Sequence, residues 1–229
     1  MLTWTIWISF LGAGLLMSPL VPAQQKNLIR WVALLIAFLG LAIGIYFYFS
    51  YDLVKGGYQF GNGDGLPWIS QLGISFKVGV DGISLPLVVL TGFIAFTGVL
   101  FSWNIESRVK EFFAFFFVLI GGVYGVFQAL DLFLLLVFYE IAIVPKYFII
   151  AIWGSTHKEY GAMKLVLYSF VGSALVLIGA LALYFVADAG TFDLEKLAAI
   201  KFPIAFQTSA FLLVFVGFAI LAGMWPFHT

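Results

Sequence analysis

The sequence predicts an all-α polytopic membrane protein with about seven transmembrane helices, the last of them broken. Of its 229 residues, 63% are hydrophobic and only 10% are charged, and the mean hydropathy is +1.11. No soluble domain covers so much apolar surface. Hydrophobic segments of a length that crosses a bilayer recur along the chain. They span residues 3–22, 30–51, 82–103, 111–129, 130–153, 161–187 and 208–225.

Composition also excludes several classes of function. Eleven acidic and eleven basic residues balance, which excludes a basic nucleic-acid surface. The chain has no cysteine, so thiolate metal sites and cysteine-ligated iron–sulfur clusters are excluded, and two histidines are too few for a multi-haem protein. Any linked redox chemistry is therefore expected in another chain, with no cofactor or metal in this one. The first segment lacks a preceding basic residue and is predicted to be a retained helix, not a cleaved leader.

The connections carry their own signals. Apolar residues alternate from Ile74 to Val80 in the long loop 52–81, which predicts a β-hairpin or extended segment at the membrane surface. The glycine-rich stretch within that loop lacks the spacing of a nucleotide-binding loop. We interpret Asp81 as the cap of the third helix in preference to an ion ligand. A short surface helix is predicted at 192–200, capped by Asp193 or Thr191.

Loop charge predicts the orientation in the membrane. The connections after the first, third and fifth segments carry six basic and three acidic residues, and the other three connections carry four basic and seven acidic residues. Because basic residues are retained on the cytoplasmic side, the first set is predicted to be cytoplasmic and the N-terminus external.

The largely apolar segment Leu130–Trp153 contains two charged residues in its interior. Glu140 lies near its middle, and Lys146 follows Pro145. Each charge costs about 2.5–3.5 kcal/mol at the centre of a membrane helix on insertion scales. We interpret Glu140 as a proton-carrying carboxylate, with a hydrogen-bonded packing role as the alternative. The position in mid-segment favours the first interpretation.

Lys146 is open to two interpretations. Six helical residues turn the chain by about 600°, so Lys146 lies about 240° around the helix from Glu140 and about 9 Å along it. A direct pair within one regular helix is not expected. Lys146 either extends to the cytoplasmic interface near Trp153 or relays protons inside the membrane. Pro145 frees the carbonyl of Ile141 and favours a bend there.

Two further residues are candidates for moving protons. Lys164 lies near the start of the sixth segment, with Tyr160 and Tyr168 at helical spacing. It serves either as an interfacial anchor or as the point where protons enter beside the fifth segment. His228 follows Pro226, which is predicted to break the last helix. It either relays protons or steadies the break by hydrogen bonding.

Four stretches together resemble a known family. Residues 78–94, 138–154, 160–179 and 218–229 are similar to the antiporter-like membrane subunits of respiratory complex I. The resemblance is strongest to subunit M of the bacterial proton-translocating NADH:quinone oxidoreductase. Similar proteins occur in multisubunit cation/proton antiporters and in membrane-bound hydrogenases.

The resemblance implies an architecture and a division of the chain. Family members have about fourteen transmembrane helices in two inverted five-helix repeats, each with a broken helix. Residues 1–110 then hold helices one to three with the external loop, and residues 111–229 hold the first repeat, truncated at broken helix seven. The chain is expected to be the N-terminal part of a longer protein that lacks the second repeat.

The resemblance also assigns site residues by position. Glu140 matches the helix-five glutamate that tunes a lysine on helix seven, Lys164 matches a basic residue at the start of helix six, and His228 matches the histidine of the break. The expected helix-seven lysine is replaced by Leu221. We hypothesise that Lys146 supplies the lost cation. The rival hypothesis is that this half-channel is weakened.

The function implied is that of a proton-translocating membrane subunit of an NADH (or related donor):quinone oxidoreductase in the bacterial inner membrane. Its partners are then other membrane subunits, both antiporter-like and quinone-site, and the lipid bilayer. NADH, FMN, iron–sulfur clusters and quinone belong to those partner subunits. The alternatives are a subunit of a multisubunit Na⁺/H⁺ antiporter or membrane-bound hydrogenase, and a non-transporting membrane scaffold.

Overall fold

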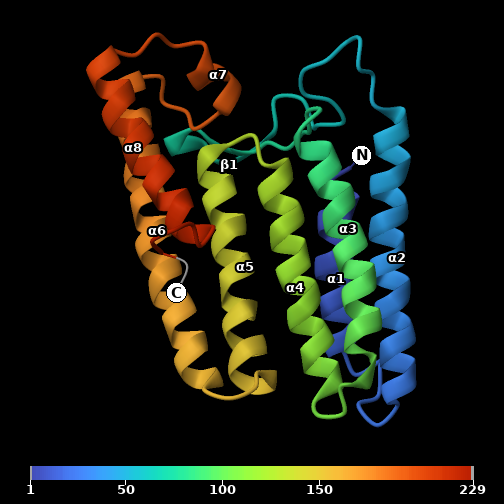
Figure 1. The fold of residues 1–229 in the computed structure, drawn as a ribbon. Coiled ribbons are helices and arrows are strands. Elements are labelled where there is room, and N and C mark those ends of the chain that lie inside the picture. Colours follow the sequence, from blue (N-terminus) through green and yellow to red (C-terminus); the bar gives the residue numbers. More distant parts are fainter. Residues whose placement is uncertain (1, 228–229) are drawn as a thin grey trace.

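All seven predicted segments are helices in the computed structural model, which describes residues 2–227. The helices stand side by side and alternate in direction along the chain (Figure 1). Six helices are long and apolar enough to cross a membrane. The predicted all-α membrane fold is therefore confirmed. The seven helices are α1 (Trp4–Met17), α2 (Lys26–Ser50), α3 (Ser84–Phe101), α4 (Val109–Gln128), α5 (Leu132–Trp153), α6 (Lys158–Ala187) and α8 (Ile204–Leu221).

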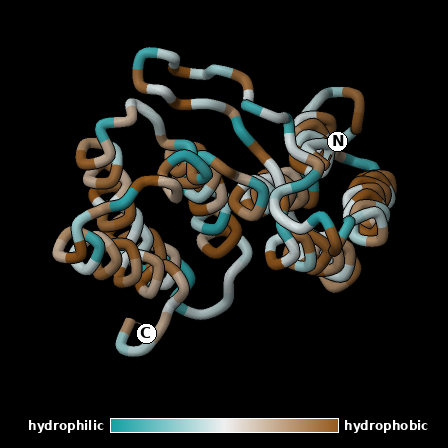
Figure 2. The backbone as a smooth tube through the Cα atoms, turned by 90° about the horizontal axis from the view of Figure 1, so that it is seen from above, coloured by the Kyte–Doolittle hydropathy of each residue, from teal (hydrophilic) through white to brown (hydrophobic). Residues whose placement is uncertain are grey.

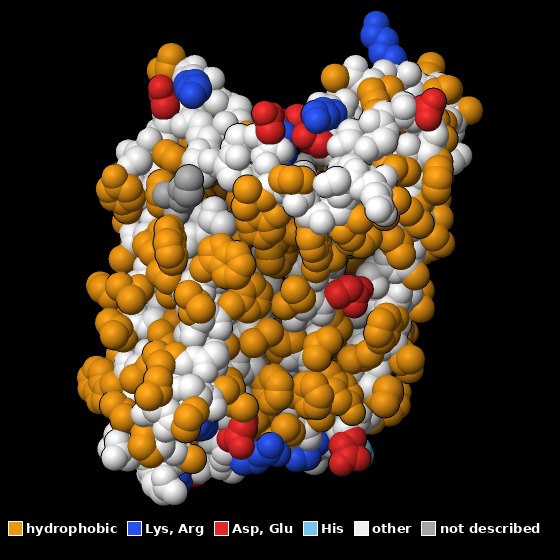
Figure 3. Space-filling view, turned by 180° about the vertical axis from the view of Figure 1, so that it is seen from behind, with side chains coloured by type: hydrophobic (Ala, Val, Ile, Leu, Met, Phe, Trp, Pro, Cys, Tyr) orange, Lys and Arg blue, Asp and Glu red, His pale blue; other side chains and the backbone are white. Residues whose placement is uncertain are grey.

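The surface has the layered character that a bilayer requires. Charged side chains gather at the two ends of the helices, and the band between them is largely apolar (Figure 3). At one end, Glu106 pairs with Lys26 at 2.6 Å and with Arg30 at 3.2 Å, linking the start of α2 to the α3–α4 connection. The other end carries the long loops. Which end faces the cytoplasm stays a prediction, as does the division of the chain at residue 110.

Helix α1 is shorter than the predicted segment 3–22. It has 14 residues, or a length of about 21 Å. Ser18 after its last turn is extended, with φ −68° and ψ 157°. Pro19 explains this conformation, because the proline ring disfavours helical geometry in the residue before it. The hydropathy of the segment therefore overestimated the length of the helix.

Helix α8 also differs from its predicted range, 208–225. It begins directly after Pro203 and ends at Leu221. The N–H of Gly223 donates to the carbonyl of Ile220 at 3.1 Å, and that of Met224 donates to the carbonyl of Ala219 at 2.9 Å. With Gly223 at φ +65°, this is a Schellman C-cap.

The prediction that Pro226 breaks this helix was therefore wrong in position. The glycine ends the helix before the proline is reached, because only glycine adopts a positive φ without steric cost.

The predicted hairpin is present at the end of the bundle that carries the long loops. Strand β1 (Leu66–Ile69) pairs antiparallel with β2 (Ile74–Phe76), and a short 3₁₀ turn, η1 (Ser70–Leu72), joins them. Seen from above, these loops cross over the helix ends (Figure 2). The extended chain continues past β2, where single bridges join Val78 to Ala129 and Val80 to Gln59.

Both predicted caps are confirmed. The Asp81 carboxylate accepts hydrogen bonds from the N–H groups of Ile83 and Ser84 at 3.0 and 2.7 Å, at the start of α3. The Asp193 carboxylate accepts from the N–H groups of Glu195 and Lys196 at the start of α7 (Leu194–Ala198). That helix has five residues, fewer than the predicted range 192–200.

A buried ion pair ties the hairpin end together, and sequence analysis did not predict it. Lys77, 6% exposed, follows β2, and its ammonium lies 2.8 Å from the carboxylate of Asp193, which is 3% exposed. Lys77 also pairs with Glu195. Nearby, Asp131 is fully buried at the start of α5, and its carboxylate accepts from the N–H of Ser75 at 3.1 Å. The hairpin, α5 and α7 are thereby held together.

Close packing of α4 against α5 fixes the helix that carries Glu140 and Lys146. A Cβ on Gly125 would lie 2.2 Å from the ring of Phe138, and a Cβ on Gly122 would lie 2.9 Å from the Cβ of Ala142. Small residues let membrane helices approach closely, and there the packing replaces the hydrophobic effect as the source of association.

Replacing Gly125 by alanine should destabilise the protein by about 1–3 kcal/mol, because the added methyl group must displace Phe138. Thermal unfolding of the detergent-solubilised full-length protein measures the change. Gly14→Ala in α1 is the matched control, since nothing lies within 4 Å of its would-be Cβ. Equal melting temperatures for the two variants would contradict the packing argument.

Lys77→Met should destabilise the protein by about 3–5 kcal/mol, because it leaves the Asp193 carboxylate buried without its cation. The double variant Lys77→Met/Asp193→Asn should recover part of the loss, since asparagine is neutral and still caps α7. Denaturation midpoints of the three proteins test this. A double variant no more stable than Lys77→Met would show that the lost charge pairing is not the cause.

The stabilisation should also depend on pH in a defined window. Burial lowers the pKa of Lys77, but its hydrogen bonds to Asp193 and Glu195 outweigh this and leave the pKa above its usual value. Burial raises the pKa of Asp193, but the hydrogen bond from Lys77 outweighs it and leaves the pKa below its usual value. The stability difference between wild type and Lys77→Met should be largest on a plateau that ends at about pH 10 on the alkaline side. On the acid side the plateau ends at the pKa of Asp193 in the variant, which burial without the lysine raises above its usual value. The difference should shrink below this plateau as Asp193 gains a proton, and above it as Lys77 loses one.

Candidate functional site

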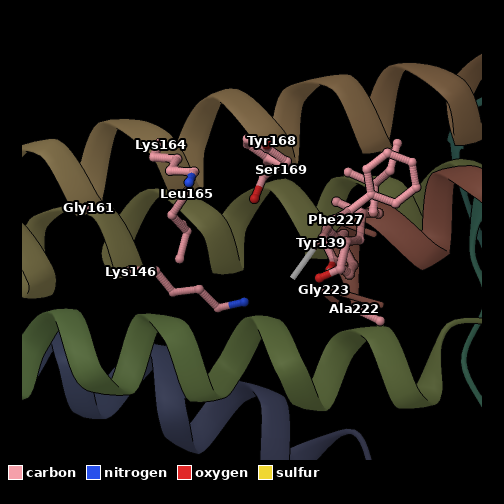
Figure 4. A pocket seen from close by; sticks show the side chains of 12 residues that line it. Tyr139, Lys146, Gly161, Lys164, Leu165, Tyr168, Ser169, Ala222, Gly223 and Phe227 are labelled. Carbon is pink, nitrogen blue, oxygen red and sulfur yellow. The ribbon is translucent and has the colours of Figure 1, made fainter. Parts of the chain in front are cut away.

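The structure brings two of the predicted site residues into one cavity. Lys146 of α5 and Lys164 of α6 both line a hollow of about 410 Å³ between α5, α6 and the end of α8. Their side chains project into it, together with those of Tyr139 and Ser169 (Figure 4). Leu221, the position where the resemblance leads one to expect a lysine, lines the same cavity.

The direction of the Lys146 side chain follows from helix geometry. Tyr139 lies seven residues before it, a rotation of about 700°, so the two residues share one face of α5. Long side chains on a helix point back toward its N-terminus. The Lys146 ammonium accordingly lies 5.9 Å from the centre of the Tyr139 ring. This geometry directs the charge toward the middle of α5 and away from Trp153, and it favours the intramembrane interpretation over extension to the interface.

Lys164 has a similar but more open environment. Its ammonium lies 5.8 Å from the ring centre of Tyr168, one of the two tyrosines that the helical spacing placed beside it. Tyr168 is 36% exposed. Within residues 2–227, neither Lys146 nor Lys164 forms an ion pair with a carboxylate. Ring faces stabilise cations, so each ammonium has a partial substitute for water.

Glu140 lies elsewhere. It lines a second cavity, of about 480 Å³, whose walls are the apolar side chains of α5 and α6 with Ser173 as the polar exception. The view from behind shows acidic atoms at mid-height in an otherwise apolar face (Figure 3). Glu140 does not line the lysine cavity, and no ion pair joins it to Lys146 within the described residues. The rotation of about 240° between them therefore separates them as expected.

The remaining predicted site residue, His228, lies outside the described residues. Tyr139 is the residue that sequence reasoning missed. Its hydroxyl lies 3.5 Å from the carbonyl of Leu221, and it is the chain neighbour of Glu140. The seven-residue spacing between Tyr139 and Lys146 was the signal that could have identified it.

The chemistry available in the lysine cavity is proton chemistry. Two amines, two phenols and a hydroxyl line it, and all of these exchange protons. Within residues 2–227, no three His, Asp or Glu side chains gather as metal ligands do.

The fold is that of a complex I antiporter-like subunit. The chain superposes on a chain of respiratory complex I from Thermus thermophilus with bound NADH, with a TM-score of 0.83 and 24% sequence identity. The match covers 100% of this chain and 45% of that one.

Sequence comparison points to the same group of proteins. Residues 129–229 match the family model described as NADH:quinone oxidoreductase/Mrp antiporter, transmembrane. The chain is 34% identical over 215 residues to NAD(P)H-quinone oxidoreductase chain 4-2 of Synechocystis sp., which covers 93% of this chain and 38% of the relative. It is 36% identical to chain 4 of Acaryochloris marina, covering 91% of this chain and 39% of the relative. The resemblance predicted from the sequence motifs is confirmed. The chain spans about two fifths of the length of these relatives.

Hydration should differ between the two cavities. The chain lacks cysteine, so single cysteines report their own surroundings once any others in the full-length protein are replaced. Ser169→Cys in the lysine cavity should react with a water-soluble methanethiosulfonate at least several times faster than Ala174→Cys in the apolar cavity of Glu140. Labelling rates in membranes, followed by mass spectrometry, give the comparison. Equal rates would contradict a hydrated lysine cavity.

Proposed function

We propose that the chain is part of a proton-translocating membrane subunit of an NADH (or related donor):quinone oxidoreductase. The observation that carries the proposal is the cavity that brings Lys146 and Lys164 to the end of α8. The names of the similar proteins, NAD(P)H-quinone oxidoreductase chains, support the class of enzyme. Electron transfer takes place in partner subunits, which hold NADH, FMN, iron–sulfur clusters and quinone. This chain carries no redox centre in the proposal.

The residues have separate parts in the proposed proton path. Lys164 receives protons from the cytoplasmic end of α6, and Lys146 holds them near the middle of α5. Lys146 supplies the cation that Leu221 does not, because both line one cavity. His228 continues the path beyond the end of α8. Glu140, on the other face of α5 and α6, is the carboxylate whose charge biases the lysines through the intervening helix.

The proposal includes a place and an orientation. The subunit lies in the bacterial inner membrane among other antiporter-like and quinone-site subunits. The hairpin end faces outward, and the end with Lys26, Arg30 and Glu106 faces the cytoplasm. A second candidate function, a subunit of a multisubunit Na⁺/H⁺ antiporter, is favoured by the family description, which joins the two classes. Copurification with NADH-oxidising subunits distinguishes them.

Lys146→Met and Glu140→Gln in the full-length subunit should each lower redox-driven proton pumping by about tenfold, because each removes a group that holds or biases the proton. Pumping in inverted membranes is measured against quinone reduction, and a native gel reports assembly. Lys201→Met, an exposed lysine on the hairpin end, is the matched control.

Each variant has its own contradicting outcome. Normal pumping by an assembled Lys146→Met complex would show that this half-channel does not depend on a cation at Lys146. Normal pumping by Glu140→Gln would make Glu140 a packing residue. Loss of assembly without specific loss of pumping would favour a scaffold.

A further inference from the structure

Tyr139 contacts two groups of the lysine cavity, one on its own helix α5 and one at the end of α8. Its ring faces the Lys146 ammonium at 5.9 Å, and its hydroxyl lies 3.5 Å from the Leu221 carbonyl. Figure 4 shows it between the lysine and the end of α8. We propose that Tyr139 is a positioning residue that holds the Lys146 ammonium at the C-terminal end of α8.

The end of α8 attracts a cation for a reason visible in its hydrogen bonds. The Schellman C-cap satisfies the carbonyls of Ala219 and Ile220, but it leaves that of Leu221 without a backbone donor within the described residues. The Tyr139 hydroxyl is the donor found there. Unpaired carbonyls form the negative end of the helix dipole, so a positive charge is stabilised beside them.

Packing between helices does not by itself place Lys146 at the end of α8. It belongs to α5. Helix α8 packs mainly on α6 and has far less contact with α5. The aromatic ring of Tyr139 bridges the distance, since it lies on the same face of α5 and touches the end of α8. The ring also offers the ammonium an electrostatic partner in a cavity that no carboxylate of residues 2–227 lines.

Lys164 does not duplicate this arrangement. It faces Tyr168, which is 36% exposed and, within residues 2–227, forms no side-chain hydrogen bond to α8, whereas the Tyr139 hydroxyl reaches the Leu221 carbonyl. The two lysines therefore differ, because within the described residues only the tyrosine beside Lys146 is hydrogen-bonded to the end of α8.

The inference rests on the proposed role of Lys146, and its test separates the two. In the full-length subunit within the assembled complex, Tyr139→Leu should lower pumping about 3- to 30-fold relative to quinone reduction, the range expected for a partly desolvated cation–ring contact. Tyr139→Phe keeps the ring and should lower pumping by no more than about threefold. Tyr147→Leu, an α5 tyrosine that does not line the cavity, is the matched control.

Moving the lysine to another position distinguishes a positioning role of Tyr139 from a purely structural one. In Lys146→Leu, adding Tyr139→Leu should cause no further loss of pumping, because there is no ammonium left to position. Lys146→Leu/Leu221→Lys should recover pumping, since residue 221 lines the same cavity. The recovered pumping should then be insensitive to Tyr139→Leu.

The outcomes show which of the two proposed roles, that of Lys146 or that of Tyr139, is wrong. If Lys146→Leu pumps normally, the proposed role of Lys146 is overturned. If Lys146→Leu fails to pump but Tyr139→Leu pumps normally, the positioning role alone is overturned. Equal losses from Tyr139→Leu with the lysine at 146 and at 221 would also overturn it, because the tyrosine would then act by packing.

Discussion

The absence of water from the bilayer core is the constraint on which the structure depends. Every polar group placed there must find its partner within the protein or in a hydrated cavity. Within residues 2–227, the Leu221 carbonyl at the end of α8 has no backbone donor, and the Lys146 ammonium pairs with no carboxylate. Both lie at one cavity, where Tyr139 contacts each of them. The end of α8 and the half-buried charge of Lys146 are therefore parts of one arrangement.

The rest of the bundle makes that arrangement rigid on one side and open on the other. Close approach at Gly122 and Gly125 fixes α5 against α4, and buried Asp131 with the Lys77–Asp193 pair anchors the end of α5 beside the hairpin. Beside this fixed helix, α8 packs on α6 and ends at Leu221, before the C-cap glycine Gly223. The cavity lies where α5 and α6 meet the end of α8.

Some of this could be predicted from the sequence, and the errors have physical causes. Hydropathy predicted the seven apolar helices, and the alternation from Ile74 predicted the hairpin. The ends of α1 and α8 were wrong because Pro19 and Gly223 act on backbone conformation, which hydropathy does not measure. Among the site residues, Lys146 and Lys164 share one cavity and Glu140 lines another. Their order in the sequence did not show this separation.

The sequence by itself determined the class of protein, the number of apolar segments and the charges within them, because transfer into a bilayer is a property of residues summed along a segment. The motifs carried the family resemblance in the same way. Only the tertiary structure decided which charges meet. Lys77 and Asp193 pair across 116 residues of sequence, and Tyr139 reaches Leu221 across 82. Such contacts depend on how helices pack side by side, and no local pattern in the chain encodes that distance.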